Sequence, residues 1–211
     1  MRIIDLSLVI GTEIESTPQG ETYIIKLPIK GDVYDGVCHR FEWHSMSGTY
    51  IDFPGHIARF DDGSDAANYP LEKLFMVETT FINLKREGRE RAITAEELDA
   101  AGVEVTGEAL FIHAREGTPF YRSKENIPYY DPSAIEWIVS RDIRLFLSDV
   151  YEKQPDQQGI FVELFRRGIA CVCCMVGLEQ VTQQQVKVCA IPIPAAGAKQ
   201  VPCRLFVVED D

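Results

Sequence analysis

The sequence has little positive charge and no long hydrophobic run. Its 211 residues include 21 lysines and arginines against 33 aspartates and glutamates, which gives a formal net charge of −12. A surface of this sign repels phosphate backbones and anionic lipid, so we expect neither a nucleic-acid nor a membrane partner. No apolar run approaches the roughly 20 residues of a membrane-spanning helix. A small-molecule substrate is the partner that we expect.

Cysteines and targeting signals are also sparse. Six cysteines are too few for a disulfide scaffold in a chain of this length. The first residues, Met1 to Leu6, carry one positive charge but neither a long apolar stretch nor a small-residue cleavage site. We therefore expect reduced thiols and a cytoplasmic protein.

The composition is that of an ordinary globular chain, with 45% hydrophobic and 26% charged residues. It predicts one domain over residues 1–211. Apolar or alternating runs predict strands at Arg2–Ile10, Tyr23–Ile29, Phe41–Asp52, Val77–Leu84, Ala109–Ala114, Ile143–Asp149, Ile169–Val176, Val186–Ile193 and Arg204–Val208. Helices are predicted after the capping box Thr94–Glu97, from Asp131–Pro132 to about Ser140, and over Gln157–Arg167. These elements indicate the α/β class, as a single compact mixed β-sheet domain with peripheral helices.

The most informative stretch is His44–His56, which reads His-Ser-Met-Ser-Gly-Thr-Tyr-Ile-Asp-Phe-Pro-Gly-His. Residues two apart on a strand share a face, so a regular strand would align His44, Met46, Gly48, Tyr50 and Asp52. Asp52 and His56 offer a carboxylate and an imidazole, which together can act as an acid–base pair on a bound substrate.

Several segments together resemble the cyclase family, which includes bacterial kynurenine formamidase and isatin hydrolase. Ile4-Asp5-Leu6-Ser7 is similar to the opening strand of the family, and Pro202-Cys203-Arg204 to its closing Pro-x-Arg strand. The family signature His-x-Gly-Thr-His-x-Asp-x-Pro-x-His is matched at Gly48, Thr49, Asp52, Pro54 and His56. The resemblance implies a swivelling β/β/α-like fold and a homo-oligomer, a dimer or tetramer with sites near the subunit interface.

The resemblance also implies a divalent metal, but the sequence departs from the family at the ligands. The ligand positions that have changed are Met46, Tyr50, Phe161 and Cys173, so only Asp52 and His56 remain. Zinc takes three protein ligands even where one position stays open. We therefore predict no metal cofactor. The alternative is zinc or manganese held by a rearranged set that includes Asp52, His56 and either His44 or Cys173.

Each remaining candidate has a functional and a structural interpretation. Tyr50 can donate from its hydroxyl, and Cys173 can act as a nucleophile beside His56 and Asp52 or simply pack in an apolar strand. Substrate-binding candidates, each of which can instead serve packing or ion pairing, are His44, Met46, Phe53 and Arg204. His113 and the pair Cys171 and Cys174 lie in apolar runs, where core packing is the prediction.

Three functions follow from these residues. The first is a cyclase-family enzyme with an eroded metal site that uses metal-independent acid–base chemistry on a small cyclic or acyl substrate, by hydrolysis, cyclisation or dehydration. The second is a metal-dependent amide hydrolase of the kynurenine formamidase type. The third is a non-catalytic homologue that binds a small molecule.

Overall fold

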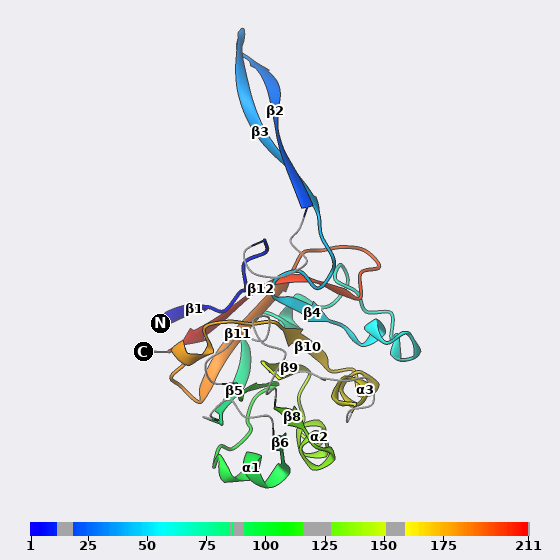
Figure 1. Ribbon diagram of the computed structural model, residues 1–211, viewed down its shortest axis with the longest axis vertical. Helices are drawn as coiled ribbons and strands as arrows, with labels where there is room; N and C mark the ends of the chain where they lie inside the picture. Colours follow the sequence, from blue (N-terminus) through cyan, green and yellow to red (C-terminus); the bar gives the residue numbers. More distant parts are fainter. Residues whose placement is uncertain (12–18, 85, 87–90, 116–127, 151–158, 211) are drawn as a thin grey trace.

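The structure is a computed structural model that describes residues 1–11, 19–84, 86, 91–115, 128–150 and 159–210. Its centre is an eight-stranded sheet in the order β1-β12-β11-β5-β7-β9-β10-β4, in which β4 also pairs with β12. The strands are β1 (Arg2–Asp5), β4 (Tyr50–Asp52), β5 (Val77–Asn83), β7 (Ala109–His113), β9 (Leu145–Ser148), β10 (Ala170–Cys173), β11 (Gln185–Pro192) and β12 (Gln200–Glu209). The second pairing of β4 closes the strands from β12 round to β4 into a barrel, and β1 lies outside the ring (Figure 1).

The sheet is mixed. Strands β5, β7, β9 and β10 run parallel to their neighbours in this group, whereas the pairings that join β1, β4, β11 and β12 are antiparallel. Together with the few helices, this arrangement confirms the predicted fold class of a compact mixed-sheet domain with peripheral helices.

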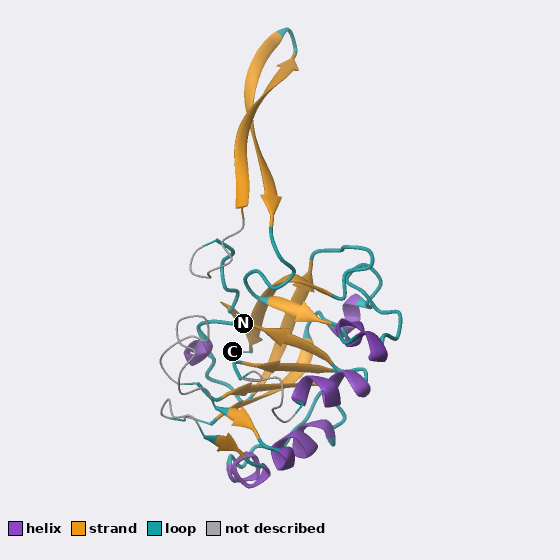
Figure 2. Ribbon diagram, turned by 45° about the vertical axis from the view of Figure 1, so that its right-hand side comes forward, coloured by secondary structure: helices purple, strands orange, loops and turns teal. Residues whose placement is uncertain are grey.

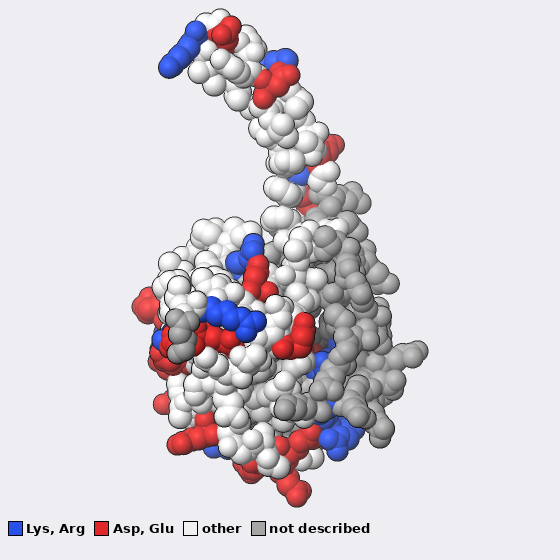
Figure 3. Space-filling view, turned by 90° about the vertical axis from the view of Figure 1, so that its left-hand side faces the viewer, with Lys and Arg blue, Asp and Glu red and all other residues white. Residues whose placement is uncertain are grey.

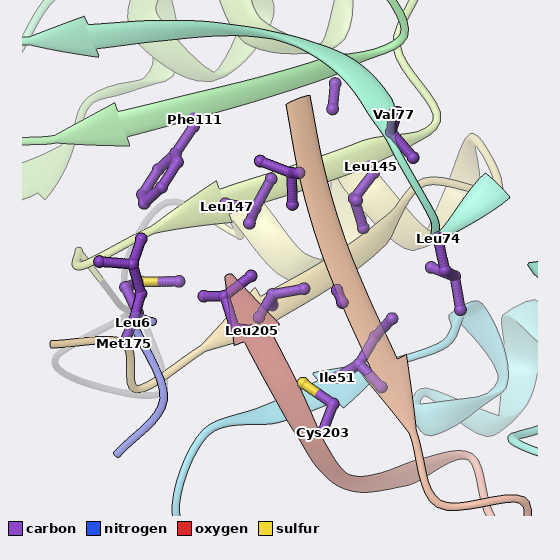
Figure 4. Close-up of a cluster of buried hydrophobic side chains, with 14 of the residues drawn as sticks. Leu6, Ile51, Leu74, Val77, Phe111, Leu145, Leu147, Met175, Cys203 and Leu205 are labelled. Atoms are coloured by element: carbon purple, nitrogen blue, oxygen red, sulfur yellow. The ribbon is translucent and has the colours of Figure 1, made fainter. Parts of the chain in front are cut away.

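Two hydrophobic cores lie on the two faces of the barrel wall. The first takes side chains from every strand of the ring and fills the interior, as Figure 4 shows for Leu6, Ile51, Leu74, Val77, Phe111, Leu145, Leu147, Met175, Cys203 and Leu205. The second lies between the outer face and the helices α1 (Ala95–Ala100), α2 (Pro132–Val139) and α3 (Ile160–Arg166) (Figure 2). Strand alternation therefore decides which residues of β4 face the interior and which face α3.

The helices begin where the capping signals predict. The backbone N–H of Glu97 donates to Thr94 Oγ1 over 3.2 Å at the start of α1. The N–H of Ala134 donates to Asp131 Oδ1 over 2.9 Å at the start of α2, and Pro132 takes the first helical position, where a missing N–H costs nothing. For α3, the predicted start at Gln157 lies outside the described residues. None of the helices in the described part of the chain has the length and apolar character of a membrane span.

The remaining elements surround the barrel. A long hairpin, β2 (Gln19–Ile29) and β3 (Asp32–Glu42), projects from the body (Figures 1 and 2). The short strands β6 (Ala92–Ile93) and β8 (Tyr129–Tyr130) pair with each other. Short 3₁₀ helices are η1 (Pro54–His56), η2 (Ala58–Phe60), η3 (Leu71–Lys73) and η5 (Leu178–Gln180).

Several strand predictions differ in extent from the observed strands, and two of them run well beyond the strand that forms. The run Phe41–Asp52 is not one strand, because β3 ends at Glu42 and β4 begins only at Tyr50. Gly48 lies between them with φ +66°, a left-handed conformation that interrupts an extended strand. At the N-terminus, β1 ends at Asp5 instead of Ile10, and Ser7 makes only an isolated bridge to Met175.

Candidate functional site

The candidate site lies on the outer face of the short strand β4. In the two ladders that flank β4, Asp52 is opposite Cys171 on one side and Gln200 on the other, and Tyr50 is opposite Cys173. Side chains directly opposite each other across a sheet point to the same face. The closure of the barrel at β4 therefore brings together five polar side chains from three distant parts of the chain.

The Asp52 carboxylate is almost completely buried, with 3% of its surface exposed. Its Oδ2 accepts a hydrogen bond from the Cys173 thiol over 3.8 Å, and its Oδ1 has no hydrogen-bond partner among the described residues. Burial raises the pKa of Asp52 to about 6, although the His56 imidazole, the Gln200 amide and the Cys173 thiol oppose the rise. The carboxyl group therefore titrates near neutral pH, and one of its oxygens is buried without a hydrogen-bond partner in the described residues.

Gln200 is held in one orientation by Ser45. The Ser45 hydroxyl donates to Gln200 Oε1 over 2.6 Å, which leaves the amide N–H groups to face Asp52. Ser45 and Gln200 were missed by the sequence analysis. No sequence signal marks them, because 155 positions separate the two residues and only the pairing of β12 with β4 brings them together.

His56 stands at the solvent side of the same site. It ends η1, directly after Pro54 and Gly55, and its side chain is exposed. The ring meets Phe165 of α3 edge to face, with 6.3 Å between ring centroids. A buried carboxyl with an exposed imidazole near it is an arrangement in which a proton can pass between a bound molecule and solvent.

Cys173 and Tyr50 both remain protonated. Cys173 is fully buried, and this burial raises the pKa of its thiol well above the usual value. Its S–H therefore donates to Asp52, and the Cys171 sulfur lies 3.9 Å away. Burial likewise raises the pKa of Tyr50 far above its ordinary value, and the nearby thiols and Asp52 add to the effect. The phenol is accordingly a hydroxyl donor across the neutral range.

The other sequence candidates lie elsewhere. The predicted alignment of His44 and Met46 with Asp52 is wrong, because both occupy the exposed turn before β4; Met46 is 52% exposed. Phe53 points to the opposite face and is fully buried against Tyr69, with 4.9 Å between ring centroids, as strand alternation requires. Arg204 forms an ion pair with Asp5 at the surface, which is the ion-pairing interpretation of this residue rather than the substrate-binding one.

Two further predictions of core packing are confirmed. His113 is buried, and its Nδ1 lies 2.7 Å from Asp149 Oδ2. The same carboxylate accepts the backbone N–H groups of Ala114 and Arg115. Cys171 and Cys174 are buried cysteines outside any disulfide, in and just after β10.

The Gly-Thr step of the signature has a structural role. Thr49 is buried; its hydroxyl donates to the Cys174 carbonyl over 2.7 Å and accepts the Leu8 N–H over 2.7 Å. Gly48 lies against the same N-terminal segment, and a Cβ at Gly48 would come within 2.7 Å of the Leu8 carbonyl oxygen. These contacts fix the turn that leads into β4, and hence the position of Asp52.

Gly48→Ala tests this role. We expect a loss of about 2 kcal/mol in the free energy of unfolding, because the left-handed φ and the backbone clash act together. Urea unfolding measures the loss. Gly63→Ala is the matched control, since Gly63 also has a positive φ, +88°, but no heavy atom within 4 Å of the added Cβ. Equal losses in the two variants would show that the contact with Leu8 contributes nothing.

The residues at the site do not fit a divalent metal. Of the ligand positions that the family resemblance implies, Met46 is in an exposed turn, Phe161 packs on Phe165, and Cys173 is a buried thiol that donates to Asp52. Within the described ranges, no three side chains of His, Cys, Asp or Glu are grouped so that they could hold a metal ion. Zinc sites use at least three such ligands.

Solved structures share this barrel fold. Isatin hydrolase A from Labrenzia aggregata, solved with benzyl benzoate bound, superposes with a TM-score of 0.75 at 18% identity, over 100% of this chain and 94% of that one. Isatin hydrolase A from Ralstonia solanacearum superposes with a TM-score of 0.73 at 16% identity, over 99% of this chain and 92% of that one. A protein described as a predicted metal-dependent hydrolase from Bacillus stearothermophilus superposes with a TM-score of 0.69 at 18% identity. The match covers 98% of this chain and 97% of that one. The chain is thus similar in fold to isatin hydrolases.

A comparison of the sequence with models of protein families identifies the family to which the chain belongs. The model of the Cyclase family, described as "Putative cyclase", matches residues 4–153, which include the whole Gly48–His56 segment. The chain belongs to the Cyclase family, and the resemblance found in the sequence is confirmed. No protein of curated function matches the chain.

Proposed function

We propose that this chain is a Cyclase-family enzyme that acts on a small cyclic or acyl substrate by acid–base chemistry without a divalent metal. The reaction would be a hydrolysis, a cyclisation or a dehydration at a carbonyl-bearing centre. The observation that carries the proposal is the Asp52 carboxyl group, which is buried, has a pKa of about 6 and keeps one oxygen without a partner in the described residues. Burying an ionisable group in this way destabilises the fold, and such groups cluster at functional sites.

Each residue has a defined part in this chemistry. Asp52 Oδ1 takes a proton from the substrate or returns one, since a pKa near the working pH favours both directions. Cys173 donates to Oδ2, and the Gln200 amide lies near enough to help stabilise the ionised carboxylate; Oδ1, which has no partner in the described residues, is the oxygen assigned to the substrate. His56 exchanges the proton with solvent. Tyr50 donates its phenolic hydrogen to the oxygen on which negative charge develops, as an oxyanion-stabilising donor does.

Cys173 has a positioning role in this scheme and is not the nucleophile. A thiol attacks as its thiolate, and burial disfavours that form at Cys173. The hydrogen bond to Asp52 uses the thiol as a neutral donor. None of the six cysteines forms a disulfide, which supports our proposal that the protein works in the reducing cytoplasm.

A second candidate is a metal-dependent amide hydrolase of the kynurenine formamidase type. The observation in its favour is that Asp52 and His56, the two ligand-type residues of the family signature that remain, are close enough for His56 to lower the pKa of Asp52. The third candidate is a small-molecule binding homologue without catalysis. It would retain ligand affinity after both residues are replaced.

Metal analysis separates the first two candidates. We expect protein purified without added ions to hold far less than one zinc or manganese per chain, and its thermal melt to be the same with and without a chelator, because the donor set is incomplete. Elemental analysis and a melt with EDTA are the measurements. About one metal per chain, together with a melt lowered by EDTA, would establish the metal-dependent candidate in place of the first.

A further inference from the structure

The His56 imidazole is carried by a segment, residues 53–66, that leaves the barrel wall after β4. The segment passes beside α3, where the His56 ring meets Phe165 edge to face (Figure 1). Its internal hydrogen bonds are local, such as the bond from the His56 N–H to the Phe53 carbonyl over 2.8 Å. Local bonds shape a turn but do not orient it relative to Asp52, so the contacts at the two ends of the segment decide where His56 lies.

Both ends of this segment are attached to residues 197–199, which lead into β12 and so to Gln200. Three hydrogen bonds make the attachment: from the Phe53 N–H to the Lys199 carbonyl over 2.9 Å, from the Gly197 N–H to Asp65 Oδ2 over 2.8 Å, and from the Ala66 N–H to the Ala198 carbonyl over 2.9 Å. Gln200 lies opposite Asp52 in the ladder between β12 and β4. The strand that supports Asp52 therefore also supports the segment that carries His56.

The side chain of Lys199 adds two further contacts to the same segment. Its Nζ donates to Asp61 Oδ1 over 2.7 Å and to the Ser64 carbonyl over 2.9 Å. The hydrogen bond from Lys199 lowers the pKa of Asp61 below its usual value, so Asp61 is ionised at neutral pH. One ammonium group thus joins two points of the loop that follows His56.

The place of this ion pair distinguishes it from the others on the surface. Surface ion pairs are ordinary in this chain, and on the face that Figure 3 shows, several lysine and arginine side chains touch acidic ones. The Lys199–Asp61 pair instead lies against the backbone of η1 at Gly55, which is buried between Pro54 and His56. A Cβ at Gly55 would come within 2.7 Å of Asp61 Oδ1 and 2.9 Å of Lys199 Cδ. A glycine at this position therefore leaves the space that the pair occupies.

We propose that Lys199 is a positioning residue, which holds His56 beside Asp52 through its ion pair with Asp61. The inference rests on the proposed function, in which Asp52 and His56 exchange a proton. The His56 side chain is exposed, so its position follows that of the η1 backbone, against which the pair lies. A misplacement of about 1 Å at a reacting group can lower a rate by about 10²-fold.

Two variants displace the pair in different ways. Lys199→Gln removes the ammonium group and leaves the backbone contacts of residues 197–199 in place. Gly55→Ala keeps both charges but puts a methyl group where the pair lies. The atoms that this methyl group meets belong to flexible side chains, so we expect the pair to move and the fold to persist.

The matched control is Lys187→Gln. Lys187 also pairs with an aspartate, Asp210, over 3.2 Å, and its side chain is 27% exposed against 25% for Lys199. It lies on β11 opposite Val208, near the end of β12, whereas Gln200 begins that strand. The loss of a similar ion pair is thereby compared at a place far from His56.

The first measurement is the nuclear Overhauser effect between the ring protons of His56 and Phe165 in the full chain. The His56 signals are assigned by their absence in His56→Ala, among the four histidines of the sequence. We expect the effect to be lost in Lys199→Gln and in Gly55→Ala, because the imidazole moves away from α3. It should be retained in Lys187→Gln.

The second measurement is steady-state turnover in the presence of EDTA. Lys199→Gln should lower kcat by about tenfold with little change in KM, because it displaces a proton-exchanging group and leaves substrate contacts in place. Lys199→Arg, which keeps a cation for Asp61, should restore most of this loss. In a His56→Ala background Lys199→Gln should cost nothing further, since the residue acts through His56.

An unchanged Overhauser effect and an unchanged kcat in Lys199→Gln overturn the proposal. An equal fold-loss of kcat in the wild-type and His56→Ala backgrounds also overturns it, because Lys199 would then act on the structure in general. If Lys199→Gln does not fold, Gly55→Ala makes the same comparison. A wild type that converts no lactone, cyclic amide or N-formyl amine would contradict the proposed function, whereas the Overhauser effect still decides whether Lys199 positions His56.

Discussion

Asp52→Asn and His56→Ala are each expected to lower kcat by roughly 10²- to 10⁴-fold with a much smaller change in KM. Asp52→Asn keeps the shape of the carboxyl group, and its amide retains an oxygen that can accept from Cys173, whereas His56→Ala removes an exposed side chain. What they remove is the group that exchanges a proton. The measurement is steady-state turnover, in the presence of EDTA, of the substrate that the wild type converts from a panel of small lactones, cyclic amides and N-formyl aryl amines.

Cys173→Ala is the control that separates positioning from nucleophilic attack. It removes the thiol that donates to Asp52 Oδ2, so the pKa of Asp52 should rise further and the acid limb of the kcat profile should move to higher pH. Turnover at the new optimum should stay within about tenfold of wild type, a smaller change than removal of an acid–base group gives. A loss as complete as that of Asp52→Asn would instead make Cys173 the nucleophile. Ligand binding without any turnover in the wild type would favour the non-catalytic candidate.

Much of the fold could be predicted from the sequence because its signals are local. The strands Val77–Asn83, Ala109–His113 and Leu145–Ser148 are buried over nearly their whole length, and aliphatic, aromatic and β-branched side chains predominate in them, as in strands covered on both faces. The caps at Thr94 and Asp131 give helix starts within a few residues. The closure of the barrel at β4 could not be predicted in this way, because it depends on the pairing of Tyr50–Asp52 with Gln200–Pro202, far along the chain.

The candidate site was predictable only where a motif marks it. Asp52 and His56 were found through the signature, whereas Ser45 and Gln200 carry no pattern of their own. The assumption of a regular strand through Gly48 led to the wrong face for Met46 and His44. Phe53 was assigned to the substrate because aromatic residues suit both a pocket and a core, and only strand alternation in the folded sheet decides between them.

A second result expected for Asp52 is that its loss stabilises the protein at alkaline pH. The pKa of this carboxyl rises from an ordinary value of 3.8 to about 6 on folding, because burial disfavours the ionised form. The native state therefore binds more protons than the unfolded state between about pH 4 and pH 6, and the stability of the wild type falls as pH rises through that window. Above pH 6, the ionised Asp52 carboxylate lowers the free energy of unfolding by about 3 kcal/mol relative to low pH, which is the free-energy equivalent of the difference between its two pKa values.

Asp52→Asn removes this ionisation, so it should unfold at a higher temperature than wild type at pH 8, by roughly 6 to 12 °C for a chain of this size. The difference should vanish near pH 4, where both side chains are neutral. Melts from pH 4 to pH 8 measure it.

Asp131→Asn is the control for these melts. Burial opposes ionisation of Asp131, but hydrogen bonds from Ser133 and Ala134 outweigh it and lower its pKa. The pH dependence of that variant should therefore have the opposite sign. If Asp52→Asn were no more stable than wild type at pH 8, some positive charge at the site, a bound metal ion or a charged His56, must compensate the buried carboxylate. If it is more stable and inactive, the protein keeps at Asp52 a charge that its fold disfavours, which selection for folding alone does not explain.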